Sequence, residues 1–329
     1  MGMQNFSPEF KTPEQYIIDI TYKIWEESGV GRINDWYATD CPRRSPHGVT
    51  YTAADVVRET LESLALFPDG EIFADDVIIG DKPSGFYSSH RARHSSTHLE
   101  DGYYGPATQR RLTTFVIADC LCRDNQIVEE WELGDGAGAV MQLGLDPVAF
   151  GKALGAKRPD AYSIGNDAMR QRWASPEGLT IVSDNAIANR IIDGYNALWN
   201  DKNLNVMSER YDRAVRFEGP GGRLCYGRSN MCRALYGILA AVPDGTFEPH
   251  HVIVRQQPGR ADCIAMRWTY CGTHSGYGCY GQPTDAPVAI LGISHFELRD
   301  GLIASEWMLA DETSIYAQIA AHEIAHGAH

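Results

Sequence analysis

The sequence contains the same domain twice, and this internal repeat constrains the fold more than any other feature. When Arg91 to Asp135 is moved forward by 176 positions, it falls on Arg267 to Asp311 without a gap. Spacing kept along a stretch this long indicates a duplicated domain, and so long a period indicates two whole folding units rather than a solenoid. The identical pairs are Arg91/Arg267, Thr97/Thr273, His98/His274, Gly102/Gly278, Tyr104/Tyr280, Gly105/Gly281, Thr108/Thr284, Ile117/Ile293, Asp124/Asp300, Ile127/Ile303, Glu130/Glu306, Trp131/Trp307, Leu133/Leu309 and Asp135/Asp311.

The repeat continues upstream with an offset that drifts by only one or two residues. Pro68-Asp69-Gly70 corresponds to Pro243-Asp244-Gly245, and Trp25 corresponds to Trp199. With 329 residues and 43% hydrophobic composition, the chain can form two cores of about 130–150 residues each.

Charge and hydropathy exclude several classes of partner. A net charge of -14 disfavours nucleic acid, because phosphate binding requires a basic face, and it also disfavours anionic membrane surfaces. No apolar run approaches the roughly 20 residues that span a bilayer, and Met1 to Lys11 lacks the apolar segment of a signal peptide. The eight cysteines form no CxxC pair. We therefore expect a reduced, cytoplasmic protein with small buried thiols.

Each unit begins with helices and continues with strands. Thr12-Pro13-Glu14-Gln15 and Thr52 to Asp55 are typical helix starts, and the Pro-Asp-Gly turns end the helical part. Alternating apolar residues then predict four strands per unit, so the fold class is α+β with a curved, mostly antiparallel sheet around helices. The predicted domains are 13–136 and 185–312, joined by a connector with short helices at 137–184 and followed by a terminal helix and tail at 313–329.

Short motifs in the second unit resemble the SnoaL-like polyketide cyclase branch of the NTF2-like superfamily. They are Gly272-Thr273-His274, Tyr280-Gly281-Gln282-Pro283-Thr284, Gly292-Ile293-Ser294-His295-Phe296, Asp300-Gly301-Leu302-Ile303 and Glu306-Trp307. The first unit has a weaker version, in Thr97-His98, Gly105 to Thr108 and Ile127 to Trp131.

The resemblance implies two tandem cone-shaped barrels, each enclosing one pocket, arranged as a pseudo-dimer. Enzymes of this branch close rings by intramolecular aldol chemistry, with a pocket carboxylate and histidine and without a metal or organic cofactor. Other members isomerise, dehydrate or hydrate small molecules, and many only bind them, so the fold alone does not select an activity.

The penultimate strand of each unit presents two candidate residues, Ala118 or Asp119 in the first unit and Ser294 or His295 in the second. A one-residue change of register decides which of each pair faces the pocket. Asp119 in an apolar pocket would have a raised pKa and could act as a general acid or base. The alternative is a polar residue on the outer face or a structural hydrogen-bond partner.

The remaining candidates also have structural alternatives. His98 and His274 are histidines kept in both copies, and either a catalytic role or hydrogen bonding to the backbone of the following loop explains them. Tyr104 and Tyr280 also have two explanations, a phenol that lines the pocket mouth or a ring that packs in a turn. His94 and Arg91 lie in a basic strand that could face an anionic ligand or solvent, where histidines four apart are about 13 Å apart, too far to share a metal. Further ligand-binding candidates are Asp76 and His251, at equivalent positions, and Trp131 and Trp307, for which packing is the simpler explanation.

His322-Glu323-Ile324-Ala325-His326 matches the HExxH pattern of zinc proteases, with His329 one turn further on. Only three residues follow it in this sequence, so we predict no functional metal site and no cofactor.

These features predict a cofactor-independent enzyme that acts on a small, apolar, oxygenated molecule by aldol cyclisation, isomerisation or dehydration. Asp119 would be the acid or base in the first unit, assisted by His94, His98 and Tyr104. His295, His274 and Tyr280 form the parallel set in the second. The alternative is a non-catalytic small-molecule-binding protein. We also expect that the tandem chain can form a homodimer.

Overall fold

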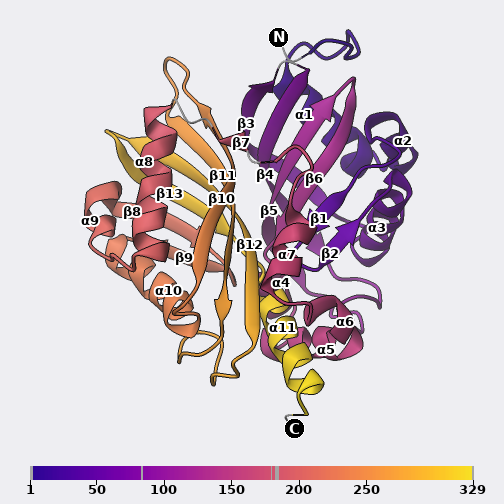
Figure 1. Cartoon of the computed structure of the whole chain (residues 1–329). Helices are drawn as coiled ribbons and strands as arrows, with labels where there is room; N and C mark the ends of the chain where they lie inside the picture. The colour runs from indigo at the N-terminus through magenta and orange to yellow at the C-terminus, as the bar shows by residue number, and fades with distance from the viewer. Residues whose placement is uncertain (1–2, 83, 179, 182–184, 328–329) are drawn as a thin grey trace. The chain divides into compact units, whose positions relative to one another are not determined.

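The computed structural model describes residues 3–82, 84–178, 180–181 and 185–327. The chain divides into two compact units, Met1–Leu145 and Asp146–His329. Each contains its own sheet and its own set of helices (Figure 1). No helix among the described residues is long and apolar enough to cross a membrane.

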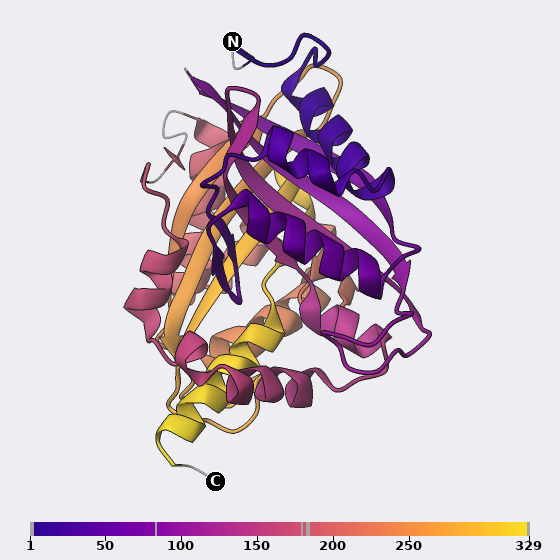
Figure 2. The ribbon, with the colours of Figure 1, turned by 90° about the vertical axis from the view of Figure 1, so that its right-hand side faces the viewer.

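The first unit has a six-stranded sheet in the order β2-β1-β6-β5-β4-β3. All neighbouring strands are antiparallel except β1, which runs parallel to β6. Helices α1 and α3 lie across one face of this sheet (Figure 2). The strands are β1 (Arg43–Ser45), β2 (Gly48–Thr50), β3 (Glu71–Lys82), β4 (Gly85–Thr97), β5 (Arg111–Arg123) and β6 (Gln126–Gly134), and the helices are α1 (Pro13–Thr21), the π-turn η1 (Tyr22–Glu26), the 3₁₀ turn η2 (Val30–Arg32), α2 (Ile33–Trp36), α3 (Ala53–Leu66) and α4 (Gly136–Gln142).

The second unit has a seven-stranded sheet in the order β7-β10-β11-β12-β13-β8-β9. Its strands are β7 (Thr180–Ile181), β8 (Tyr211–Gly219), β9 (Arg223–Tyr226), β10 (Thr246–Arg255), β11 (Asp262–Thr273), β12 (Pro287–Arg299) and β13 (Leu302–Leu309). Its helices are α5 (Pro147–Lys157), α6 (Pro159–Tyr162), α7 (Asn166–Trp173), α8 (Ala186–Tyr195), the π-turn η3 (Asn196–Asn200), α9 (Val206–Arg210), α10 (Arg228–Ala241) and α11 (Glu312–Ala325).

The two sheets pair their repeated strands in the same register. Arg91 lies opposite Ile117 and Arg267 opposite Ile293, as the 176-residue offset requires. The first long strand of each unit also carries a bulge at the same place, before Asp76 in β3 and before His251 in β10. The expected fold class, two tandem α+β units that each combine a mostly antiparallel sheet with helices, is confirmed.

The repeated turn residues have a structural role. The side chain of Asp69 accepts a hydrogen bond from the Thr97 amide (2.7 Å), and Asp244 accepts the equivalent bond from Thr273 (2.7 Å). Each bond ties the Pro-Asp-Gly turn to the end of a long strand. Asp135 likewise accepts from the Gly138 amide at the start of α4. Because these bonds depend on spacing rather than on ligand chemistry, both copies keep them.

Several elements differ from the sequence expectations. The strands β1, β2 and β9 are too short to give an alternating signal, and the longer β8 was also not expected from the sequence. The first long strands of the two units cover Glu71–Lys82 and Thr246–Arg255. The predicted connector contains α4, which belongs to the first unit, and α5 to α7, which belong to the second.

The interior of the second unit is packed with aromatic rings. Tyr195, Trp199 and Trp268 are each at most 2% exposed, and the rings of Trp199 and Trp268 stack with centroids 6.1 Å apart. Phe247 lies 6.0 Å from Trp268. Gly292 of β12 permits this packing, because a Cβ atom there would lie 2.2 Å from the Trp268 indole.

We predict that Gly292→Ala destabilises the second unit by about 1–3 kcal/mol, the usual cost of overpacking a well-filled core. Urea unfolding followed by tryptophan fluorescence measures the loss. Trp268→Ala should remove the clash, so Gly292→Ala should cost little in that background. An equal cost in both backgrounds would contradict this explanation of the glycine.

Candidate functional site

The first unit contains a cavity of about 240 Å³ between its helices and its sheet. Such a volume is sufficient for a small organic molecule, since an engineered cavity of about 150 Å³ binds benzene. Most of the wall is apolar, and the titratable residues Tyr37, His90, His94, Glu130 and Glu132 interrupt it. The other lining residues are Ile17, Ile20, Thr21, Trp25, Ser63, Ile72, Ala92, Thr114, Phe115, Val116, Ala118, Ile127 and Gly134.

The structure resolves the register question on the penultimate strands. Ala118 lines the cavity of the first unit, so its neighbour Asp119 projects from the opposite face of β5. In the second unit Ser294 is inside, where its hydroxyl lies 3.1 Å from both the Tyr195 hydroxyl and the Trp268 Nε1. His295 therefore projects from the opposite face of β12. Neither Asp119 nor His295 is part of the interior wall.

The sheet places two carboxylates of β6 in the cavity wall, Glu132 and the more deeply buried Glu130. Its Oε1 lies 3.4 Å from the Tyr37 hydroxyl and 3.6 Å from the Cys120 thiol. Burial, followed by repulsion from Glu132, raises the pKa of Glu130 to about 7, although Arg43 opposes the shift. A carboxyl group with this pKa is present in both protonation states at neutral pH and can transfer a proton in either direction.

Arg43 of β1 orients the two carboxylates. Its guanidinium lies 2.7 Å from Glu132 and 3.6 Å from Glu130, and it also pairs with Glu59 of α3. The pairing of Arg43 with Glu130 across the parallel strands β1 and β6 fixes this arrangement. The Tyr37 hydroxyl and the Arg43 guanidinium therefore both hold Glu130 in place. Arg43 forms its closer ion pair with Glu132.

The two histidines of the wall, His90 and His94, are neutral at physiological pH. Burial lowers the pKa of His90 to about 4, and burial also lowers the pKa of His94. Each has a serine hydroxyl near Nδ1, Ser88 at 3.4 Å for His90 and Ser96 at 3.5 Å for His94. A neutral imidazole can donate a hydrogen bond to a ligand oxygen from one ring nitrogen and accept with the other.

The second unit contains the equivalent carboxylate without a cation. Glu306 accepts hydrogen bonds from the hydroxyls of Tyr195 and Tyr211, the latter at 2.9 Å. Its strand neighbour across β8 is Phe217, where the first unit has Arg43 opposite Glu130. Burial raises the pKa of Glu306 to about 7. This carboxyl group lies among the aromatic side chains described above.

His98 and Tyr104 lie in the loop between β4 and β5, and they are not among the residues that line the cavity. His274 and Tyr280 lie in the equivalent loop between β11 and β12. His98 Nδ1 lies 3.2 Å from both the amide and the hydroxyl of Thr108, and His274 Nδ1 lies 3.0 Å from the Thr284 hydroxyl. Tyr104 packs against His98 with ring centroids 5.9 Å apart. Tyr280 packs against Tyr316. These contacts stabilise the loop between the second and third long strands of each unit.

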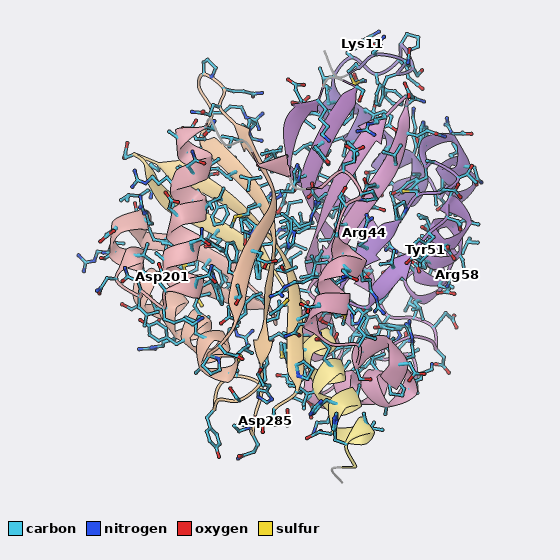
Figure 3. The ribbon with its side chains drawn as sticks, viewed as in Figure 1. Lys11, Arg44, Tyr51, Arg58, Asp201 and Asp285 are labelled. Atoms are coloured by element: carbon cyan, nitrogen blue, oxygen red, sulfur yellow. The ribbon has the colours of Figure 1, made fainter. Side chains whose placement is uncertain are left out.

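The remaining predicted ligand-binding residues occupy the sheet surface opposite the interior or the strand bulges. Trp131 and Trp307 alternate with the two buried glutamates along β6 and β13, and the guanidinium of Arg44, labelled in Figure 3, lies 4.6 Å from the Trp131 ring. Arg91 forms an ion pair with Asp75 (3.4 Å). Asp76 and His251 sit at the equivalent bulges, and Asp76 accepts a hydrogen bond from the Val77 amide.

Within the described part of the chain, no group of three or more His, Cys, Asp and Glu side chains is arranged to hold a metal. His322 and His326 of the HExxH segment have ring centroids 4.1 Å apart near the end of α11. His329 lies outside the described residues.

Sequence reasoning missed Glu130, Tyr37 and Arg43 as site residues. The signal for Glu130 was present, because Glu130 and Glu306 are an identical pair within the repeat. A carboxylate kept in both copies at a buried strand position requires hydrogen-bond partners. Tyr37 and Arg43 had no comparable signal, since they lie on a bridge and a strand too short to predict from the sequence pattern.

Each unit thus combines a mostly antiparallel sheet, helices and one buried carboxylate at an equivalent strand position. Residues 189–319 match the model of the SnoaL-like polyketide cyclase family. This match lies within the second unit, and the first unit repeats its long strands in the same register.

Solved structures similar to the chain match over the length of one unit. AclR, a putative hydroxylase from Streptomyces galilaeus, is 19% identical with a TM-score of 0.35, covering 41% of this chain and 97% of its own. IdmH, a putative polyketide cyclase from Streptomyces antibioticus, is 22% identical with a TM-score of 0.34, covering 41% and 99%. A putative SnoaL-like polyketide cyclase from Jannaschia sp. CCS1 is 15% identical with a TM-score of 0.34, covering 42% and 97%. No curated protein matches the chain significantly.

We predict that Glu306 lowers stability as the pH rises from about 4.5 to 7. The native state keeps its proton up to about pH 7, whereas the unfolded chain releases it near 4.5, so the unfolded state gains over this interval and the penalty is complete above pH 7. The shift corresponds to roughly 3 kcal/mol. Urea unfolding of wild type and Glu306→Gln between pH 4 and 8 measures the difference, and parallel stability curves would contradict it.

Proposed function

We propose that the first unit is the active half of a cofactor-independent acid–base enzyme. Its substrate is a small, mostly apolar, oxygenated molecule held in the 240 Å³ cavity. The observation that carries the proposal is the placement of Glu130, a carboxyl group with a pKa of about 7, in the wall of an apolar cavity. Perturbed titratable groups in a cavity favour a functional site.

In the proposed mechanism, ionised Glu130 removes a proton from a carbon next to a substrate carbonyl. The raised pKa makes Glu130 a stronger base than an ordinary carboxylate while leaving a large ionised fraction at neutral pH. His90 or His94, as a neutral imidazole, donates a hydrogen bond to the carbonyl oxygen and stabilises the enolate that forms. Protonated Glu130 then returns the proton at another atom, which completes an isomerisation, a dehydration or a ring closure.

Arg43 and Tyr37 position the base. The Tyr37 hydroxyl lies 3.4 Å from Oε1 of Glu130, and Arg43 lies 3.6 Å from Oε2 on the other side. Because Arg43 pairs more closely with Glu132, at 2.7 Å, it does not hold Glu130 fully ionised. The assembly restrains the side chain while leaving its proton exchangeable.

This assignment differs from the sequence expectation in the acid or base and in two of its three assisting residues. Asp119 was expected to be the acid or base, with His94, His98 and Tyr104 as assistants. The proposal keeps His94, replaces Asp119 by Glu130, and gives His98 and Tyr104 the structural role that their contacts indicate. Cytoplasmic location and homodimer formation remain predictions.

We predict that Glu130→Gln reduces turnover by at least about 100-fold, the usual contribution of a general base, while the fold is retained. The assay follows deuterium incorporation from D₂O next to the carbonyl of cyclic ketones and enones by NMR. Two matched variants serve as controls: Asp119→Asn, on the opposite face of β5, and Glu306→Gln, at the equivalent position of the second unit. Both should exchange at the wild-type rate.

Loss of exchange in Asp119→Asn but not in Glu130→Gln would restore the sequence-based assignment. If the wild-type protein binds the probes without any exchange, the first unit is a binding site rather than an active site. Circular dichroism and thermal unfolding of each variant exclude loss of structure as the cause.

We predict that kcat/KM of the wild-type protein rises with pH through a single ionisation near 7 and then remains constant. Glu130 acts as a base only when ionised, and its pKa is about 7. His90, whose pKa is about 4, stays neutral near pH 7 and therefore adds no second ionisation to the pH profile of kcat/KM. A profile that falls above pH 7 would instead make Glu130 a general acid.

A further inference from the structure

The interior of the second unit repeats the cavity of the first with larger side chains. Ala92 pairs with Val116 across β4 and β5, and Trp268 pairs with Gly292 across the equivalent strands β11 and β12. The same strand registers match Ile72 with Phe247 and His94 with Tyr270. Ala92, Ile72 and His94 of the first cavity therefore correspond to larger aromatic side chains in the second unit, whereas Val116 corresponds to the smaller Gly292.

The same relation holds on the helix that covers the sheet. Thr21 and Tyr195 each end the helix, α1 or α8, that immediately precedes the π-turn carrying Trp25 or Trp199. Thr21 lines the cavity. Tyr195 instead extends a buried phenol that lies 5.3 Å from the Phe247 ring and 6.4 Å from the Trp268 ring.

The hydroxyl of that phenol reaches the buried carboxylate. Tyr195 donates a hydrogen bond to Oε1 of Glu306, and Tyr211 donates to Oε2 at 2.9 Å. In the first unit Tyr37 takes the place of Tyr211, because Tyr37 bridges to Ile127 as Tyr211 pairs with Ile303. Thr21 provides no equivalent of the second phenol.

One oxygen of the first carboxylate is correspondingly unsatisfied. Oε2 of Glu130 is buried and accepts no hydrogen bond from any described residue, although the Arg43 guanidinium lies 3.6 Å away. A buried carboxylate oxygen without a donor is costly, and a donor supplied by a ligand removes that cost. The unsatisfied oxygen, the missing phenol and the open cavity all occur in the same unit.

We infer that the first unit binds a planar, hydroxylated aromatic molecule of one or two rings, whose hydroxyl donates to Glu130. Its rings would occupy the space that the Tyr195 phenol and the Trp268 indole fill in the second unit. The volume of about 240 Å³ suits this size, since about 150 Å³ accepts one benzene ring. Two carboxylates in the wall, Glu130 and Glu132, disfavour an anionic ligand. The inference deepens the proposed function, on which it rests only for the location of the site.

Isothermal titration of the full chain with 2-naphthol tests the inference. We expect one site per chain, with binding at least tenfold weaker for naphthalene, which lacks the donor, and for the anion 2-naphthoate. The double variant Ala92→Trp/Val116→Gly copies the second unit's Trp268 and Gly292 into the first and should weaken 2-naphthol binding by more than tenfold. Trp268→Ala, which alters only the second unit, is the matched control and should retain the wild-type site.

Thr21→Tyr provides a second variant if the double variant does not fold, because it places a phenol where Tyr195 lies and should also weaken binding by more than tenfold. The inference is overturned if wild type does not bind 2-naphthol at millimolar concentration, or if the folded filling variants bind it as wild type does. The deuterium-exchange assay of Glu130→Gln is independent of these measurements. Exchange that depends on Glu130 without naphthol binding would overturn the ligand class alone.

Discussion

The structure of both units depends on one carboxylate placed inside an apolar sheet. Glu130 and Glu306 occupy the same position on β6 and β13, and each is at most 4% exposed. A carboxyl group buried in this way must bind a hydroxyl or a cation, or remain protonated. Tyr37 and the β1 residue Arg43 meet this requirement for Glu130, and Tyr211, the first residue of β8, contributes to it for Glu306. These elements are therefore essential although their sequence signal is weak.

The two copies satisfy the same requirement in different ways. The second unit surrounds Glu306 with phenols and a serine, and aromatic rings pack beside them. The first unit replaces Phe217 by Arg43 and Met308 by Glu132, and it leaves a cavity where the rings would be. Function and stability make opposing demands on an interior, and duplication allows each copy to meet one of them.

The sequence was sufficient to predict the fold because the fold depends on spacing. The gapless repeat, the Pro-Asp-Gly turns and the alternating strands specify two α+β units, and the repeated Asp69 and Asp244 retain their turn contacts. The site depends on which way a side chain points. A shift of one residue exchanges Ala118 for Asp119, and pattern alone does not determine that choice when both faces of a strand are rich in apolar residues. Arg43 and Tyr37 reach Glu130 through long-range pairing, which local sequence does not encode.

A raised carboxyl pKa does not by itself distinguish the two halves. Glu130 and Glu306 have pKa values shifted to about 7 by the same cause, burial, yet only Glu130 lines the 240 Å³ cavity. In the second unit both carboxylate oxygens of Glu306 accept hydrogen bonds from tyrosine hydroxyls of the chain itself, so this buried carboxyl group belongs to a structural hydrogen-bond network. In the first unit Oε2 of Glu130 has no such donor among the described residues, and Glu130 is also a lining residue of the cavity. Access and an unsatisfied oxygen, rather than acidity, are therefore the physical basis for assigning chemistry to the first half of the chain.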